Sequence, residues 1–480
     1  MHADVPVSSR YRPDPRYPEL GGEFFDPVRP ADFPQTVLRF RNQRWAERVG
    51  LADLTEAEWL AAFGRFEPLP QNQPQPLAMR YHGHQFRSYN PDLGDGRGFL
   101  FAQLRDDAGR LLDLATKGSG QTPWSRAGDG RLTLKGGVRE ALATEMLEGL
   151  GVPTSKTFSL VETGEALARG DEPSPTRSSV LTRLSWSHIR FGSFQRLAYF
   201  DRADLTAQLI DHVIELYYPE LLPLAAQDRG AALLAAVVER AAVLTASWMA
   251  AGFVHGVLNT DNMNITGESF DYGPYRFLPK NDPNFTAAYF DHSGLYAFGR
   301  QPQAVFWNLQ QLAACFTLVS PEQEPLVEAL NGFRDAYQRA LVEALLRRLG
   351  VKSRELEADI SLAEAALAAL DAGGERLRWE PLFFDWFCGA ASEARALSGP
   401  RRGLYQEAPF TRLRTLLADY EPDRPERLEH PVFAAPEPEE LLIDEIEALW
   451  SSIAEKDDWA PLEGKLRRLG QAREGWGFAG

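Results

Sequence analysis

One segment near the middle of the chain constrains the fold more than any other. Residues 252–262 read GFVHGVLNTDN, and Asp271-Tyr272-Gly273 follows nine residues after Asn262. A long apolar helical pattern at 231–251 precedes the segment. Kinase-like enzymes hold a divalent metal ion with an Asn and with the Asp of an Asp-Phe-Gly motif. Asn262 and Asp271 fit this pair, and their hard oxygen atoms suit Mg²⁺ or Mn²⁺.

A glycine-rich loop lies upstream at 93–98. Gly94 and Gly96 would let backbone N–H groups approach a phosphate closely, and Arg97 adds a cation. A tight turn before a strand would use the same glycines. The loop therefore leaves a phosphate site and a simple turn as two interpretations.

A lysine and a carboxylate follow the loop. Two apolar runs around the turn at 106–109 predict a β-hairpin that ends at Lys117. Glu140 lies 23 residues further on, within a predicted helix at 137–150. A carboxylate on such a helix would aim the lysine at phosphate groups. Taken separately, each residue would also fit an exposed surface position.

The central segment departs from ordinary kinases at one position. Small-molecule kinases carry His-Gly-Asp followed by four residues and an Asn, and Val257 here takes the place of that aspartate. A carboxylate occurs instead at Asp261, beside Asn262. Either the base has moved to Asp261, or phosphoryl transfer in the usual manner is lost. A purely structural loop rich in Asn and Asp is the remaining alternative.

The pattern along the chain predicts an α+β protein with two lobes around a cleft. We expect an N-terminal extension at 1–80, a β-rich N-lobe at 81–195 and a helical C-lobe at 196–480. The residue pattern predicts a strand at 180–184, a polar loop at 163–176, and helices at 54–66, 137–150, 205–218, 231–251, 305–318, 325–349, 360–372 and 438–454.

Composition and charge exclude several classes of protein. The chain has 51 Lys and Arg against 67 Asp and Glu, a net charge of −16, so a broad nucleic-acid surface is not expected. Two cysteines, Cys315 and Cys388, are too few for a disulfide framework or a four-cysteine zinc site. The first residues form no targeting segment, and no uninterrupted apolar stretch of about 18 residues occurs. We therefore expect a cytoplasmic protein that binds neither nucleic acid nor membrane.

These motifs together resemble the selenoprotein O family, pseudokinases that transfer AMP to proteins. The similarity is dense over residues 80–315 and thin elsewhere, and Asn259-Thr260-Asp261-Asn262-Met263 combined with Asp-Tyr-Gly-Pro is highly specific. The matching stretches are 81–85, 93–98, 117–120, 129–131, 139–140, 151–154, 180–183, 189–192, 255–263, 271–274, 296–298, 301–302 and 307–310.

The resemblance implies a protein-kinase-like, two-lobed fold with a β-rich N-lobe and an enlarged helical C-lobe. It implies that ATP binds flipped, with its γ-phosphate inside and its α-phosphate facing the acceptor. Glu140 would pair with Lys117, Asn262 and Asp271 would hold Mg²⁺ or Mn²⁺, and Asp261 would accept the proton. Carried over by position, the nucleotide would be bound by Gly94, Gly96, Arg97, Lys117, Asp129, Gly130, Arg183, Arg190 and Asp271.

The implied reaction is transfer of AMP from ATP to Ser, Thr or Tyr hydroxyls of proteins, and some bacterial members are also reported to use UTP. A true kinase and a silent ATP-binding scaffold remain alternatives. Val257 weighs against the kinase, and the complete metal and lysine set weighs against the scaffold. The sequence departs from the family at Arg87, usually Gly, and at Gly136-Gly137. It also lacks the cysteine or selenocysteine that members often carry near the C-terminus, so redox control is in doubt.

Overall fold

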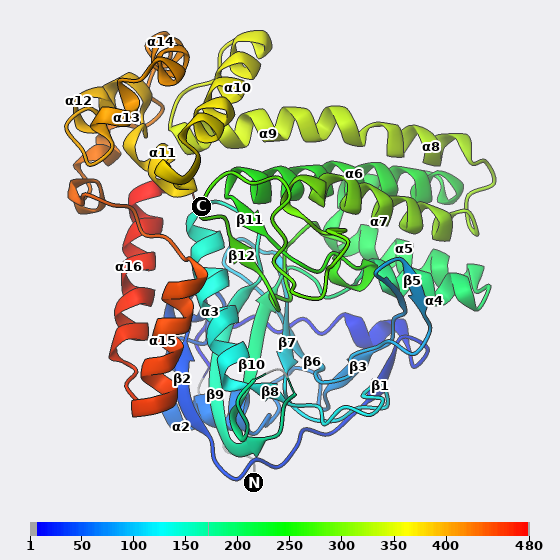
Figure 1. Cartoon of the computed structure of the whole chain (residues 1–480). Helices are drawn as coiled ribbons and strands as arrows, with labels where there is room; N and C mark the ends of the chain where they lie inside the picture. Colours follow the sequence, from blue (N-terminus) through cyan, green and yellow to red (C-terminus); the bar gives the residue numbers. More distant parts are fainter. Residues whose placement is uncertain (1–6, 171, 479–480) are drawn as a thin grey trace.

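The N-terminal half of the protein forms an antiparallel β-sheet. The computed structural model describes residues 7–170 and 172–478, so the expectations that rest on residues 1–6 and 479–480 lie outside the described residues. The eight-stranded sheet has the order β1-β3-β6-β7-β10-β9-β2, with β8 paired to β10 (Figure 1). Its strands are β1 (Phe25–Pro27), β2 (Val37–Arg41), β3 (Leu77–Met79), β6 (Leu100–Arg105), β7 (Leu111–Lys117), β8 (Leu132–Thr133), β9 (Lys156–Leu167) and β10 (Thr176–Ser185).

The hairpin of β6 and β7 places Lys117 at the inner end of the sheet. Its turn uses Asp106, whose carboxylate accepts hydrogen bonds from the backbone and side chain of Arg110, and Gly109, whose φ of +81° suits glycine. Every residue of β7 is buried, because the sheet is covered on both faces. Lys117 lies opposite Leu181 of β10 and is held in register by the central strands. The predicted hairpin is confirmed.

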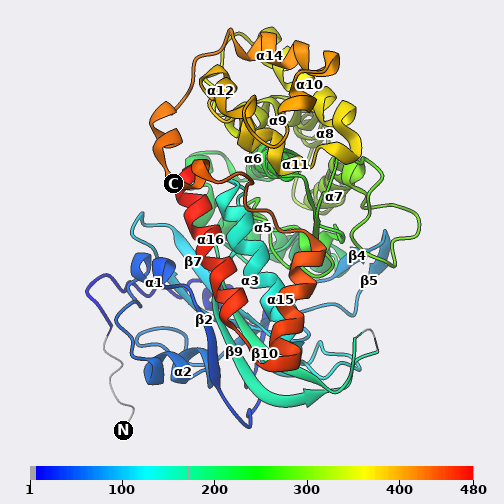
Figure 2. The same ribbon diagram turned by 60° about the vertical axis from the view of Figure 1, so that its left-hand side comes forward.

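Helices cover the two faces of the sheet. An aromatic cluster that includes Trp59 and Phe63 of α2 (Glu56–Gly64) packs with Phe158 of β9, next to α1 (Gln43–Arg48). Helix α3 (Leu134–Gly149) contacts β9 and β10 and carries Glu140. The C-terminal helices α15 (Ile443–Lys456) and α16 (Ala460–Trp476) return along α3, as Figure 2 shows.

The second half of the chain is helical. Two-residue strands β11 (Phe253–Val254) and β12 (Arg276–Phe277) pair with each other. The hairpin of β4 (Gly83–Gln85) and β5 (Ser88–Asn90) contacts residues 260–262. The remaining helices are α4 (Phe191–Tyr199), α5 (Ala203–Tyr217), α6 (Ala226–Ala250), α7 (Gln301–Phe316), α8 (Glu324–Asn331), α9 (Phe333–Leu349), α10 (Leu356–Gly373), α11 (Trp379–Asp385), α12 (Glu393–Ala396), α13 (Arg402–Tyr405) and α14 (Thr411–Leu417).

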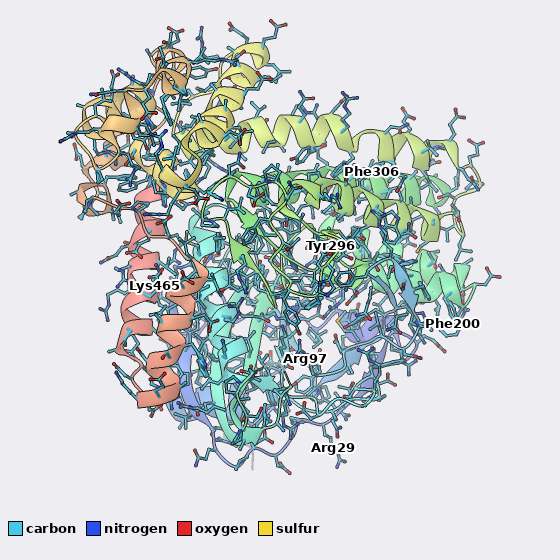
Figure 3. All side chains as sticks on the ribbon, viewed as in Figure 1. Arg29, Arg97, Phe200, Tyr296, Phe306 and Lys465 are labelled. Atoms are coloured by element: carbon cyan, nitrogen blue, oxygen red, sulfur yellow. The ribbon has the colours of Figure 1, made fainter. Side chains whose placement is uncertain are left out.

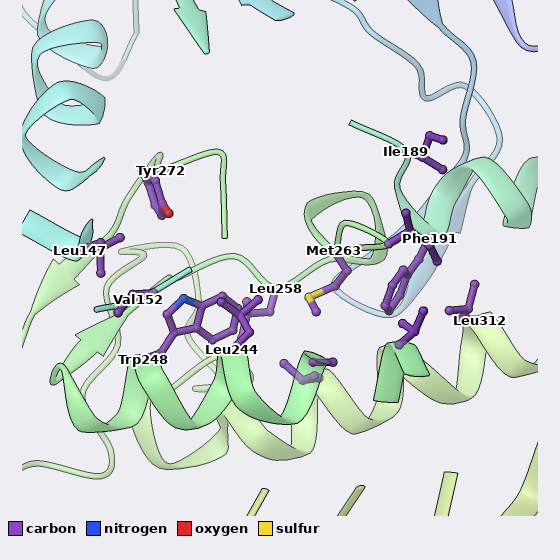
Figure 4. Close-up of a cluster of buried hydrophobic side chains, with 14 of the residues drawn as sticks. Leu147, Val152, Ile189, Phe191, Leu244, Trp248, Leu258, Met263, Tyr272 and Leu312 are labelled. Carbon is purple, nitrogen blue, oxygen red and sulfur yellow. The ribbon is translucent and has the colours of Figure 1, made fainter. Parts of the chain in front are cut away.

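Helix α6 packs beneath the central segment, residues 252–262. Figure 4 shows Trp248 and Leu244 of this helix near Leu258 and Met263, which flank the Asn and Asp residues of the loop. Helix α6 is long and apolar enough to cross a membrane by length and composition alone, but most of its apolar window is buried inside the fold. The apolar helix predicted at 231–251 is thus present within α6, and most of its apolar window is buried.

Two predictions about local structure need correction, and several helices were missed. The polar loop expected at 163–176 is wrong in its first part, because β9 continues to Leu167. The helix expected at 325–349 is interrupted at Gly332, which separates α8 from α9. No helix was predicted at the positions of α1, α4, α11, α12, α13, α14 and α16. The other expected helices and the strand at 180–184 are present with shifted ends.

Candidate active site

A cleft of about 800 Å³ lies between the sheet and the helical part of the molecule. Figure 3 labels Arg97 on the sheet side and Tyr296 on the helical side of this region. Glu140 lies outside the lining and reaches the cleft through Lys117. The predicted residues that line it are Gly94, Gly96, Arg97, Lys117, Asp129, Gly130, Arg183, Arg190, Asp261, Asn262 and Asp271.

Two cations and two carboxylates meet at the inner end of the cleft. Lys117 Nζ donates to Glu140 and, over 2.7 Å, to Asp271 Oδ1. Arg183 Nη2 donates to the same Asp271 oxygen at 3.1 Å, and its Nε lies 3.5 Å from Glu140 Oε2. Lys117, Arg183 and Glu140 are all buried. Strands β7 and β10 and helix α3 therefore hold Lys117 and Arg183 at one point. There both cations can exchange their carboxylate partners for phosphate oxygens.

Asp271 is held in an unusual backbone conformation. Its φ of +66° lies in the left-handed region, which costs free energy in a residue other than glycine. Asn262 Nδ2 donates to Asp271 Oδ2 at 2.9 Å, so the two expected metal ligands are adjacent. Burial would raise the pKa of Asp271, but Lys117 and Arg183 hold it well below its ordinary value. Asp271 is therefore an ionised carboxylate at neutral pH.

Asp261 has a different environment. Its Oδ1 is buried and makes no hydrogen bond within the part of the chain that the structure describes. Burial raises the pKa of Asp261 to about 6, against the opposing charge of Arg190. Gly83 of β4 passes so close that a Cβ atom there would lie 3.0 Å from Asp261 Oδ1. A carboxylate with a free oxygen and a raised pKa is suited to accept a proton.

Arg190 connects the loop of Asp261 to the glycine-rich loop. Its Nη1 donates to the Asp261 carbonyl at 2.9 Å, and its Nη2 donates to Asp95 Oδ1 at 3.3 Å. The guanidinium lies 4.4 Å from the ring centroid of Tyr81, which also lines the cleft. Arg190 is thus a buried cation with its planar face supported by an aromatic ring.

The hairpin of β4 and β5 positions the loop that carries Asp261. The His84 amide donates to Thr260 Oγ1 at 2.7 Å, and the Phe86 amide donates to Asn259 Oδ1 at 3.0 Å. His84 Nδ1 lies 2.7 Å from Gln195 Nε2. These contacts give the segment around His84 a positioning role, which the sequence did not indicate.

Packing against Trp124 explains Gly94 and Gly96 of the glycine-rich loop, a reason other than the close approach to a phosphate that the sequence suggested. A Cβ atom at Gly94 would lie 2.4 Å from Trp124 Cγ, and one at Gly96 would lie 2.8 Å from the Trp124 carbonyl oxygen. Ser125 Oγ donates to the Gly96 carbonyl, which fixes the segment around Trp124 over the loop. Close packing against this covering segment already requires glycine at both positions.

The segment around Trp124, which covers the glycine-rich loop, brings further residues to the cleft. Asp129 lies at its rim and pairs with Arg169 at 2.7 Å. Gly130 crosses Gly120 so closely that a Cβ atom would lie 2.2 Å from the Gly120 carbonyl carbon. Arg126 also lines the cleft and, in the described residues, has no carboxylate within ion-pair distance. Sequence motifs gave no signal for Trp124 or Arg126.

The donor set at Asn262 and Asp271 fits a hard divalent cation. No group of three or more His, Cys, Asp or Glu side chains able to hold a metal ion occurs among the described residues. One carboxylate and one amide oxygen in the lining of the cleft match the way Mg²⁺ is held, with substrate phosphates and water as the other ligands. Two nearby histidines contact other side chains: His82 contacts the Tyr89 hydroxyl, and His84 contacts the Gln195 amide.

Comparison with known proteins identifies the class of this chain. A protein of Synechocystis sp. is 45% identical over 476 residues, covering 95% of this chain and 97% of the relative. One of Gloeobacter violaceus is 46% identical over 95% of both chains, and one of Synechococcus elongatus is 54% identical over 72% of this chain and 70% of the relative. All three carry the name protein nucleotidyltransferase YdiU.

The chain is therefore an enzyme of the nucleotidyltransferase class. The family model described as protein adenylyltransferase SelO matches residues 8–469. The chain belongs to this family, which confirms the resemblance seen in the sequence.

Proposed function

We propose that this enzyme transfers AMP from ATP to the hydroxyl group of a Ser, Thr or Tyr residue in a protein. One observation carries the proposal. Asp261 has a buried carboxylate oxygen that no described residue hydrogen-bonds, and it lies beside Asn262 and Asp271, while the position of an ordinary kinase base is the apolar Val257. The cleft thus combines a proton acceptor and a cation site at a place where a kinase base is lacking.

The proposal includes a protein-kinase-like fold with ATP bound in the flipped orientation. Residues 81–195 would form the N-lobe and 196–480 the C-lobe, with 1–80 as an extension that adds strands to the sheet. Lys117 and Arg183 at the inner end support this orientation, because two buried cations favour the two terminal phosphates there. The α-phosphorus would then face Asp261.

The proposed reaction balances as a single displacement. The acceptor oxygen bonds to the α-phosphorus, and the bond from that phosphorus to the α–β bridging oxygen breaks. Pyrophosphate leaves, and the hydroxyl proton passes to Asp261. Lys117, Arg183 and Arg190 stabilise the charge that develops on the leaving group. Mg²⁺ or Mn²⁺, held by Asn262 and Asp271, would supply Lewis-acid stabilisation of the phosphates.

Radiolabelled nucleotide tests the reaction type. We expect a protein acceptor incubated with the enzyme and Mg²⁺ or Mn²⁺ to retain label from the α-phosphate of ATP and none from the γ-phosphate. Retained γ-label would identify a kinase, and no transfer would identify an ATP-binding scaffold. UTP labelled at the α-phosphate, in a parallel reaction, shows whether the pyrimidine nucleotide is also a substrate.

The Asp261→Ala variant tests the proton acceptor. We expect α-label transfer to fall by about 10²–10⁴-fold, because the general base is lost, while ATP affinity stays within about threefold. ATP affinity is measured by calorimetry on the same preparation. The matched control is Asp92→Ala, an exposed carboxylate outside the cleft lining. Unchanged transfer in Asp261→Ala would contradict the assigned role.

A further inference from the structure

A second cavity adjoins the nucleotide cleft, and most of its lining residues have no role in the chemistry described above. It has a volume of about 420 Å³ and shares Arg97, Lys117, Arg131 and Arg169 with the cleft. Its other walls are the first turns of α3 and the segment 272–290. The Lys117–Glu140 pair therefore lies on the boundary between the two cavities.

The second cavity is basic in a chain whose net charge is −16. Three carboxylates line it, those of Glu140, Glu172 and Glu447. Seven basic side chains face them, those of Arg97, Lys117, Arg131, Lys135, Arg139, Arg169 and Arg276. Arg97 and Arg276 have no carboxylate within ion-pair distance among the residues described. Three of the seven are also paired with carboxylates beyond the lining, as Lys117–Asp271, Arg131–Glu165 and Arg169–Asp129. Within the described part of the chain, the positive charge that remains without a carboxylate partner is therefore that of Arg97 and Arg276.

Two of these cations are held close together by one backbone carbonyl. Arg139 Nη2 donates to the Tyr275 carbonyl at 3.2 Å, and Arg276 Nη1 donates to the same oxygen at 2.8 Å. Arg139 is buried, and its Nη1 lies 3.9 Å from Glu447, a partner that it shares with Lys135. Two guanidinium groups on one acceptor repel each other, and an anion between them would remove that cost.

Helix α3 adds to the same potential. Its N-cap Thr133 and the first-turn residues Lys135 and Gly136 line the cavity, and the helix is 16 residues long. The N-terminus of a helix carries a partial positive charge and favours an anion. The helix therefore reinforces a site that the arginine side chains already define.

We propose that this cavity binds the inorganic pyrophosphate released by the reaction and forms its exit path. This role rests on the proposed function, since nucleotidyl transfer from ATP releases pyrophosphate and phosphoryl transfer by a kinase does not. Lys117 lines both cavities, so a diphosphate that leaves the inner end of the cleft meets Arg276 and Arg139 without losing contact with a cation. The class of ligand is a diphosphate anion, and orthophosphate shares its chemistry.

Direct binding of pyrophosphate tests the site without any transfer reaction. Calorimetry on the nucleotide-free full chain compares the wild type with the double variant Lys135→Gln/Arg276→Gln, whose two residues lie outside the nucleotide cleft. We expect pyrophosphate affinity to fall at least tenfold while the affinity for a non-hydrolysable ATP analogue changes less than twofold. The control Lys352→Gln/Arg412→Gln removes two exposed charges elsewhere and should change neither affinity.

Several results would overturn the inference. They are unchanged pyrophosphate affinity in the double variant, an equal loss of pyrophosphate and ATP analogue affinity, and no binding to the wild type. Orthophosphate that binds as tightly as pyrophosphate would refute the assignment to the product. A thermal unfolding scan checks that the double variant folds, and Lys135→Gln alone, at a partly exposed position, replaces it if it does not.

The binding test and the transfer test can fail separately. Absence of α-label transfer would refute the proposed function and leave the binding result standing. Where transfer occurs, we expect the double variant to raise the inhibition constant of added pyrophosphate by the same factor as its dissociation constant. An inhibition constant equal to that of the wild type would contradict the exit path.

Discussion

At the scale of single residues, the position of Asp261 depends on the absence of a side chain at Gly83. A Cβ atom at this position would lie 3.0 Å from Asp261 Oδ1 and 3.1 Å from Leu93 Cδ1. Both distances are shorter than ordinary contacts, so the carboxylate must move by a few tenths of an ångström. For Gly83→Ala we expect kcat to fall by about tenfold, because small displacements of a proton acceptor are costly. ATP affinity should stay unchanged.

The measurement is the initial rate of α-label transfer at saturating ATP, together with calorimetric ATP binding. The control is Gly403→Ala, since a Cβ atom at Gly403 meets nothing within 4 Å. A Gly83→Ala enzyme with the wild-type kcat would show that the carboxylate tolerates displacement. An equal loss of ATP affinity would instead indicate a wider disturbance of the cleft.

Motifs predicted part of the site, and tertiary contacts supplied the rest. Lys117, Glu140 and Asp271 were predicted because their residue types and spacing follow from phosphate and metal chemistry, and the structure brings them into contact. Asp95 and Trp124 were missed, because their roles depend on where distant loops cross. No pattern along the chain records such a crossing.

At the scale of secondary-structure elements, helix α16 packs against α3 and stabilises its position. Arg473 of α16 pairs with Glu145 and lies 3.8 Å from Glu148, and both carboxylates are buried. For Arg473→Ala we expect a loss of about 3 kcal/mol in the free energy of unfolding, because the variant leaves buried carboxylates without this cation. ATP affinity should also fall, since α3 carries Glu140.

Urea unfolding and calorimetric ATP binding measure the two effects. Arg468→Ala on the same helix is the control, because Arg468 is half exposed and surface ion pairs contribute about 0–1 kcal/mol. A loss of stability equal in the two variants would show that α16 packs on α3 without the help of this ion pair. A loss of stability with unchanged ATP affinity would show that α16 has no influence on nucleotide binding in the cleft.

Two of the elements that the sequence missed, the end of β9 and helix α16, have polar residues at buried positions that the fold satisfies. Thr163 and Glu165 made the end of β9 resemble a loop, but Glu165 accepts hydrogen bonds from Arg131, and Thr163 bonds to Ser178. Helix α16 has Lys465 on its buried face, paired with Glu439 and Glu445. Hydrophobic periodicity does not detect a strand or helix whose buried positions are charged and paired.

At the scale of the whole molecule, the C-terminal segment connects the helical end to the sheet. After α10–α14, the chain passes Glu440 and returns along α3 as α15 and α16 (Figure 2). Glu440 Oε2 accepts from Arg378 Nε at 2.7 Å, and its carbonyl accepts a hydrogen bond from Lys465 of α16. This residue therefore links the helical end of the molecule to the helix that supports α3.

The contribution of the Glu440 carboxyl to the free energy of unfolding should depend on pH. Burial raises the pKa of Glu440 to about 7, against the opposing charge of Arg378. A carboxyl whose pKa is higher in the folded state stabilises the protein below its unfolded pKa of about 4.3, and this contribution is lost as the pH rises to 7. For wild type relative to Glu440→Gln, we expect the difference in free energy of unfolding to fall by on the order of 2 kcal/mol between pH 4.5 and 8.

Urea unfolding of both proteins at several pH values between 4.5 and 8 measures this difference. Glu421→Gln, which removes an exposed carboxylate and leaves Glu440 in place, should keep the wild-type slope. Parallel curves for wild type and Glu440→Gln would mean that Glu440 stays ionised in the folded protein. In that case Arg378 outweighs burial, and Glu440 and Arg378 form an ordinary ion pair with no pH dependence in this range.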